Sequence, residues 1–164
     1  MKYRPLHKEE LESLQDDFVK FLASNSVTAS DWTELKSNDP SKAEQLIGVF
    51  SEIVWEKVLG NIKFMRHRFA SEMRVYKFDE ESATAVVLRL GKSGVDFTDA
   101  DDVKKLAAGK LDLSKYDPEI LHGTRNYRKP RKEEIFELME MGARPCNEAF
   151  WRSITRMLPD QYKS

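Results

Sequence analysis

The sequence has a single cysteine, Cys146, and so cannot form an internal disulfide. It also lacks any apolar run near the roughly 18 residues of a membrane span. Charged residues follow Met1 closely, where a secretory signal would place an apolar segment. A lone thiol without such segments is typical of a reducing compartment. We therefore expect a cytoplasmic bacterial protein with no membrane partner.

Linkers and repeats are also missing from the chain. No stretch is rich enough in glycine, serine or proline to separate domains, and no internal repeat is found. The chain has 164 residues, of which 40% are hydrophobic, so it can bury a core without disulfides or metals. We therefore predict that residues 1–164 form a single domain.

Sequence motifs that bind nucleotides or cofactors are absent. Gly91, Lys92 and Ser93 resemble the end of a phosphate-binding P-loop, but Val86 stands where that motif requires its first glycine. The sequence has neither the Gly-x-Gly-x-x-Gly fingerprint nor the Gly-x-Ser-x-Gly elbow of hydrolases. We therefore expect no cofactor, and the sequence gives an enzymatic function no direct support.

Histidine is scarce, and its three copies, His7, His67 and His122, lie far apart. None has a second histidine or a cysteine at the spacing of metal ligands, so we predict no metal site. Folding could still bring His67 and His122 together with carboxylates. A small metal-dependent or hydrolytic enzyme therefore stays open as an alternative function.

The strongest strand signal lies in residues 72–97. Residues 73–78 and 83–90 are rich in β-branched and aromatic side chains, and polar residues 79–82 between them favour a turn. Consecutive apolar residues at 85–88 indicate a central strand that is covered on both faces. We predict a small antiparallel sheet of about three strands within residues 72–97, packed with several α-helices in an α+β fold.

Helices are predicted from apolar spacing on both sides of this sheet, over residues 8–23, 41–59, 131–141 and 148–158. Thr28, with Asp31 three positions later, has the pattern of a capping box at the start of another short helix. Thr98 is expected to cap a helix whose first turn is acidic.

Two segments give weaker signals. Residues 62–69 fit either a helix or a strand, and we favour the helix. Residues 110–127 have little periodicity and are predicted to form a loop with a short turn near Pro118.

The net charge of −1 conceals acidic blocks at 8–59 and 79–119 and basic blocks at 62–78 and 122–158. The best candidate for a binding surface is a basic segment in the last block, with one interleaved aromatic side chain: Arg125, Tyr127, Arg128, Lys129, Arg131 and Lys132. A solvated loop that faces acidic helices is the commoner reason for such a pattern. With a slightly acidic chain overall, we do not expect nucleic acid as a partner and keep a weak nucleic-acid binder only as a second alternative.

Several stretches together resemble a family of short uncharacterised Bacteroidota proteins, classed as a domain of unknown function: MKYR (1–4), FVKFLA (18–23), ASDW (29–32), VFSEIVWEKVL (49–59) and IFEL (135–138). The resemblance spans most of the chain but supplies no catalytic or binding residues. It implies only a small bacterial protein of unassigned role. The function that the residues favour is a non-catalytic binding or protein-interaction domain, with its partner and oligomeric state left open.

Overall fold

The structure is a computed structural model that describes residues 2–158. It divides the chain into two compact units, Met1–Gly60 and Asn61–Ser164. The first unit is helical, and the second contains the sheet. The α+β class expected from the sequence is therefore confirmed, while the single domain predicted for residues 1–164 stays a prediction.

Four helices form the described part of the first unit: α1 (Lys8–Ser13), α2 (Gln15–Ser24), α3 (Ala29–Asn38) and α4 (Pro40–Asn61). The single helix expected over residues 8–23 is interrupted at Leu14, whose backbone leaves the helical region. The capping box at the start of α3 is confirmed. The backbone N–H of Asp31 donates to Thr28 Oγ1 (3.2 Å), and the N–H of Thr28 donates to Asp31 Oδ2 (2.8 Å).

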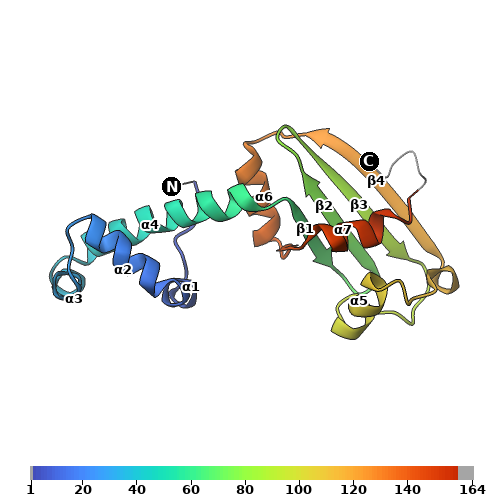
Figure 1. Cartoon of the computed structure of the whole chain (residues 1–164), viewed down its shortest axis with the longest axis horizontal. Helices are drawn as coiled ribbons and strands as arrows, with labels where there is room; N and C mark the ends of the chain where they lie inside the picture. The colour runs from blue at the N-terminus through green and yellow to red at the C-terminus, as the bar shows by residue number, and fades with distance from the viewer. Residues whose placement is uncertain (1, 159–164) are drawn as a thin grey trace. The chain divides into compact units, whose positions relative to one another are not determined.

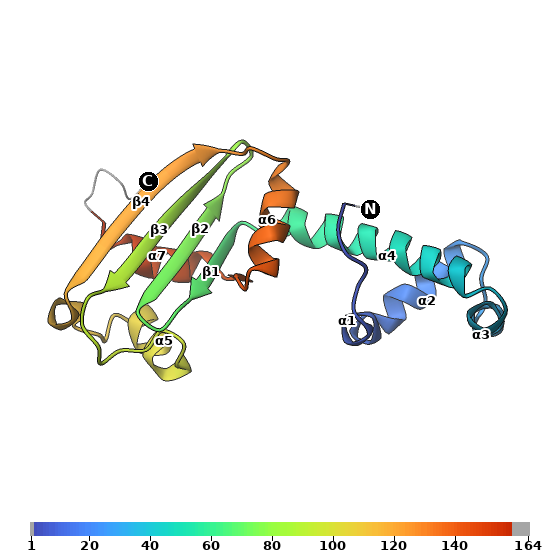
Figure 2. The ribbon, with the colours of Figure 1, turned by 180° about the vertical axis from the view of Figure 1, so that it is seen from behind.

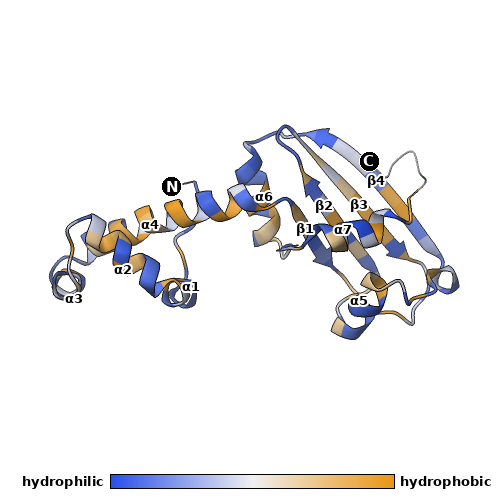
Figure 3. Ribbon diagram, in the orientation of Figure 1, coloured by the Kyte–Doolittle hydropathy of each residue, from blue (hydrophilic) through white to orange (hydrophobic). Residues whose placement is uncertain are grey.

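Helix α4 is the apolar centre of this unit, as its hydrophobic colouring in Figure 3 shows. Phe50 packs against Phe18 of α2 with ring centroids 5.0 Å apart. Trp55, also on α4, donates its indole N–H to the carbonyl oxygen of Arg4 at 3.0 Å. This hydrogen bond holds the N-terminal segment against α4. Val49 and Ile53 remain exposed, so α4 is covered on fewer sides than its composition suggests.

The second unit is built on a five-stranded antiparallel sheet in the order β4-β3-β2-β1-β5. The strands are β1 (Phe64–Arg68), β2 (Glu72–Phe78), β3 (Ser82–Leu90), β4 (Pro118–Asn126) and β5 (Arg144–Pro145). The predicted hairpin is confirmed as β2 and β3, with Val75 opposite Val86. Residues 95–97 form no strand; Val95 and Phe97 are instead buried in the loop before α5 (Ala100–Ala107).

The predicted count of about three strands was too low because two strands lie outside residues 72–97. The helix favoured for 62–69 was wrong: β1 pairs with β2 along its whole length. Backbone pairing in a sheet overrides the weak helical spacing of a short segment. The loop predicted for 110–127 was also wrong, because most of it is the long strand β4; the short turn expected near Pro118 is present as a 3-10 turn (Leu113–Tyr116).

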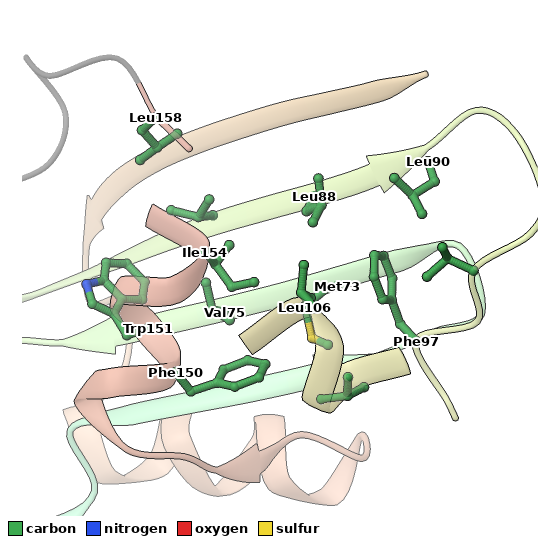
Figure 4. Close-up of a cluster of buried hydrophobic side chains, with 13 residues drawn as sticks. Met73, Val75, Leu88, Leu90, Phe97, Leu106, Phe150, Trp151, Ile154 and Leu158 are labelled. Carbon is green, nitrogen blue, oxygen red and sulfur yellow. The ribbon is translucent and has the colours of Figure 1, made fainter. Parts of the chain in front are cut away.

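One face of the sheet carries the main core of this unit. Helices α5 and α7 (Glu148–Thr155) lie over this face (Figure 1). Inward-facing side chains of β2 and β3, including Met73 and Leu88, pack with Phe97, Leu106 and Ile154 (Figure 4). Asn147 caps α7, whereas α5 is capped by Asp99 instead of the expected Thr98. The Asp99 carboxylate accepts two backbone N–H bonds, and Thr98 donates to Asp96 instead.

The two faces of β3 predict different costs for the same substitution. Val86 is fully buried in the core and Val87, on the other face, is half-buried. Val86→Asp should lower the free energy of unfolding by about 4 kcal/mol or more, because it buries an unpaired charge. Val87→Asp should cost much less, and Thr28→Ala in α3 about 1 kcal/mol. Urea titration measures this ranking, and equal losses at 86 and 87 would contradict the assignment of the two faces.

Candidate binding groove

The second face of the sheet is open over β2, β3 and β4 within the described part of the second unit. Figure 2 views this face, with α7 behind the strands. The strand register arranges its side chains in rows across the sheet. Phe78, Ala83 and Arg125 form one row, and Tyr76, Ala85 and Gly123 form the next. Each row runs from an aromatic residue on β2 to a small one on β3.

These rows form the floor of a groove with a volume of about 580 Å³. Helix α6 (Arg131–Glu140) and the turn after it supply the opposite wall through Leu138 and Met141. The aromatic residues at the β2 end of these rows, Tyr76 and Phe78, flank small residues on β3 and β4, and these small residues leave the groove hollow. A Cβ atom added to Gly123 would meet no heavy atom within 4 Å. The volume lies in the range of about 300–1,000 Å³ that is usual for ligand sites.

Glu134 ties β4 to the helix that walls the groove. Its carboxylate accepts two hydrogen bonds from the Arg125 guanidinium, the shorter at 2.7 Å. It also accepts the backbone N–H groups of Arg128 at 2.5 Å and Lys129 at 3.1 Å. Glu134 is a buried charge, and these contacts satisfy it. Its hydrogen bonds, with that of Arg125 first, lower the pKa of the Glu134 carboxyl to about 2.

The predicted basic segment surrounds this carboxylate, but most of its side chains have partners within the protein. Lys129 forms an ion pair with Glu137. Tyr127 donates its hydroxyl to the carbonyl oxygen of Asp79 at 2.7 Å. Arg131 turns inward and donates to the carbonyl oxygens of Ile62 and Phe78.

Three of the six predicted residues line the groove: Arg125, Arg128 and Lys129. Tyr127, Arg131 and Lys132 are not among its lining residues. The Arg128 side chain is exposed and has no ion pair within residues 2–158, although its backbone N–H is bound to Glu134. Arg128 therefore presents the groove's available positive charge.

The open face continues past the groove toward the other end of the strands. The next row contains Val87 and Leu121, and Leu121 is 42% exposed. Beyond it, Glu72 accepts a hydrogen bond from Arg89 at 3.0 Å, and Arg89 also pairs with Glu119 at 3.3 Å. On β3 and β4 the face thus has apolar side chains between two charged ends, while Arg74 of β2 stands in the same row as Val87 and Leu121.

The two histidines considered for a metal site do not meet. His67 lies on β1 and His122 on β4, with two strands between them, a separation of about 14 Å at the usual strand spacing. The register also places them on opposite faces. Burial, with the nearby cations Arg74 and Arg144, lowers the pKa of His67. The described residues contain no group of three or more His, Cys, Asp or Glu side chains that could hold a metal ion.

Sequence reasoning missed the groove's floor and its apolar wall. Tyr76, Ala83 and Ala85 were predicted as strand residues but not as part of a site, and Gly123 was placed in a loop. The alternation of small residues at 83 and 85 was a visible signal. It could not be interpreted without β4, whose Gly123 and Arg125 complete the rows.

A model of one protein family matches residues 1–159, which is nearly the whole chain and covers both units. The chain belongs to DUF6495, a family of unknown function. The resemblance to a family of unknown function is therefore confirmed, while a Bacteroidota origin stays a prediction. No curated protein and no solved structure matches this DUF6495 chain. Within residues 2–158, the structure contains no helix of the length and apolarity that crossing a membrane requires.

Glu134 makes stability depend on acid pH. A carboxyl whose pKa is lowered from 4.5 to about 2 stabilises the fold above the unfolded value, and this contribution is lost as pH falls from about 4.5 to 2. Glu134→Gln should therefore cost about 2 kcal/mol at neutral pH. The difference from wild type should shrink toward pH 2. Urea titrations across this range measure it, with Glu133→Gln on the same helix as the control. A pH-independent difference would contradict the role of the charge.

Cys146 should react slowly. Burial raises the pKa of its thiol to about 11, against a partial lowering by Arg66. A rise of two pKa units reduces the thiolate fraction about a hundredfold. Alkylation by iodoacetamide at pH 7 should be at least about tenfold slower than that of a small model thiol, and should recover in urea. A rate faster than the model thiol would instead indicate an activated cysteine.

Proposed function

We propose that this DUF6495 protein is a non-catalytic cytoplasmic binding protein, whose groove holds a short segment of a partner protein. The observation that carries the proposal is the hollow floor of Ala83, Ala85 and Gly123 beneath aromatic and aliphatic walls. The lone cysteine and charged surface support a cytoplasmic location.

The shape of the groove favours a large apolar side chain as the anchor. Small floor residues leave depth, while Tyr76, Phe78 and Leu138 offer apolar surface around it. Burial raises the pKa of the Tyr76 hydroxyl, so this residue stays a neutral wall at physiological pH. A Leu or Phe side chain buried here would contribute about 1.5–3 kcal/mol.

The charge of the groove favours an acidic residue beside that anchor. The guanidinium group of Arg125 is already paired with Glu134, and the ammonium group of Lys129 with Glu137. Arg128 has no such partner among the described residues and can form a charge-assisted bond to a carboxylate. A partner segment with an apolar residue next to Asp or Glu therefore fits both features.

The alternative functions have weaker support. The residues that line the groove include no histidine or cysteine, which are the usual general bases and nucleophiles of small hydrolases. Nucleic-acid binding would require several cations free to contact phosphates, whereas Arg125, Lys129 and Arg131 are engaged inside the protein.

The test uses labelled heptapeptides with Leu or Phe beside Glu, and matched peptides with Ala for the apolar residue or Lys for Glu. Fluorescence anisotropy should show roughly micromolar binding of the first set and at least about tenfold weaker binding of both matched sets. Gly123→Leu should fill the groove and abolish binding. Because Gly123 has ordinary backbone angles and open space, this variant should fold normally.

Charge reversal provides the second arm. Arg128→Glu should weaken binding of the acidic peptides and favour their Lys counterparts. Lys92→Glu reverses an exposed charge in the turn after β3, outside the groove, and should leave binding unchanged. Peptide binding that is indifferent to both Gly123→Leu and Arg128→Glu would exclude the groove as its site, and failure of all peptides to bind would overturn the proposal.

A further inference from the structure

A second, smaller pocket lies at the β1–β5 edge of the sheet and shares no lining residue with the groove. Its volume is about 280 Å³. The residues that line it are Arg66, Arg68, Thr98, Gly142 and Arg144. Three of the five are arginines, and none is acidic. A pocket lined in this way is suited to bind an anion, because arginine side chains present several N–H donors with a fixed positive charge.

The strand register brings these arginines together. Arg66 of β1 lies directly opposite Arg144 of β5, a position at which Cα atoms are about 4.5–5.5 Å apart. Arg68 follows Arg66 two residues along β1, so the two side chains leave the same face of the sheet. Like charges placed opposite one another destabilise a pair of strands. An anion bound among the three arginines would offset this repulsion.

All three guanidinium groups keep N–H donors that have no acceptor within residues 2–158. The Arg66 guanidinium lies over the ring of Phe150 on α7, 4.9 Å from its centroid, which positions the cation but gives its N–H groups no oxygen acceptor. Arg144 donates to two backbone carbonyl oxygens from Nη1 alone, so Nε and Nη2 remain. The exposed side chain of Arg68 forms neither a hydrogen bond nor an ion pair in the described part of the chain.

The nearest carboxylates in sequence to Thr98 are already bound to the backbone of their own loop. Asp96 accepts the N–H and the hydroxyl of Thr98, at 2.8 and 2.6 Å. Asp99 accepts two backbone N–H groups at the start of α5. Among the described residues, neither carboxylate forms an ion pair with an arginine of the pocket. Because the Thr98 hydroxyl donates to Asp96, the guanidinium groups are left to supply the contacts to a ligand.

We propose that this pocket binds the phosphate group of a small phosphomonoester. Guanidinium groups match the oxygen atoms of phosphate in geometry, and three of them suit a group whose charge is about −1.5 to −2 at pH 7. The volume of about 280 Å³ is just below the range usual for drug-sized ligands, so it leaves space for a small organic part beside the phosphate. This site is separate from the groove and does not depend on the peptide binding proposed there.

The surroundings favour a single phosphate group over a nucleic-acid strand. A strand requires cations spaced along its backbone as well as aromatic residues on which bases stack. On β2, the strand next to β1, Arg74 is paired with Glu72 and Lys77 with Asp79. The acidic loop around Thr98 repels an extended polyanion on the other side of the pocket. The available positive charge is therefore confined to the pocket itself.

An NMR titration of the full-length chain with phenyl phosphate at constant ionic strength tests the site. The Kd should be about 1 mM or tighter, and the largest changes in backbone amide shifts should fall on residues 66–68 and 142–144. Phenyl sulfate has the same shape but one negative charge, and should bind at least about fivefold more weakly. Inorganic phosphate should compete for the same residues. If it bound more tightly than phenyl phosphate, the assignment to a phosphomonoester would be wrong.

Substitutions identify the residues that bind. Arg68→Ala and Arg144→Ala should each raise the Kd for phenyl phosphate at least about fivefold, and both side chains are exposed, so the variants should fold. Lys63→Ala removes an exposed charge just before β1, outside the pocket, and should leave the Kd unchanged. An equal loss in Lys63→Ala would overturn the proposal, since it would indicate attraction by net charge alone. So would the absence of shifts at these residues up to about 20 mM ligand, or tighter binding of a mixed-sequence oligonucleotide than of phenyl phosphate.

Discussion

The groove of the second unit depends on the carboxylate of Glu134. This one group joins the end of β4, through Arg125, to the backbone N–H groups that precede α6. Arg131, in the first turn of the same helix, donates to carbonyl oxygens at the start of β1 and the end of β2. Because α6 supplies one wall, polar contacts as well as apolar packing set the width of the groove. Such a buried carboxylate is stable only while all its partners are present.

Elements that carry their own local signal could be predicted from the sequence. The β2–β3 hairpin has two β-rich runs around a polar turn, and the cap at Thr28 needs only residues within one helical turn. Strand β4 carries no such signal, because exposure on both faces leaves no alternation to detect. Strand β1 is short, and its Met65 is fully buried on the sheet face that does not carry the α7 core. Its apolar residues therefore do not mark a single buried face in the sequence. Both strands are set by pairing with distant residues, which local spacing does not contain.

The site shows the same division. The basic segment could be recognised from the sequence because charge is a property of composition. Its ion-pair partners could not be recognised, since Glu134 lies nine residues from Arg125 and on another element. The sequence therefore suggested more positive charge available for binding than the structure has. Arg125 and Lys129 form ion pairs with Glu134 and Glu137, and Arg131 donates to backbone carbonyl oxygens of the fold. The floor could be recognised only from the register of three strands, because both of its rows end on β4, the strand that could not be predicted. Arg128 was predicted, lines the groove and has no ion-pair partner among the described residues.

An open sheet face exposes apolar surface to water, and the composition of this one limits that exposure. Ala83, Ala85 and Gly123 offer little apolar area to solvent while the groove is empty, yet they leave the depth that an entering side chain can fill. Larger residues there would cover the strands better but would remove the cavity. Gly123 also weakens β4, because glycine in a strand has no side chain to pack.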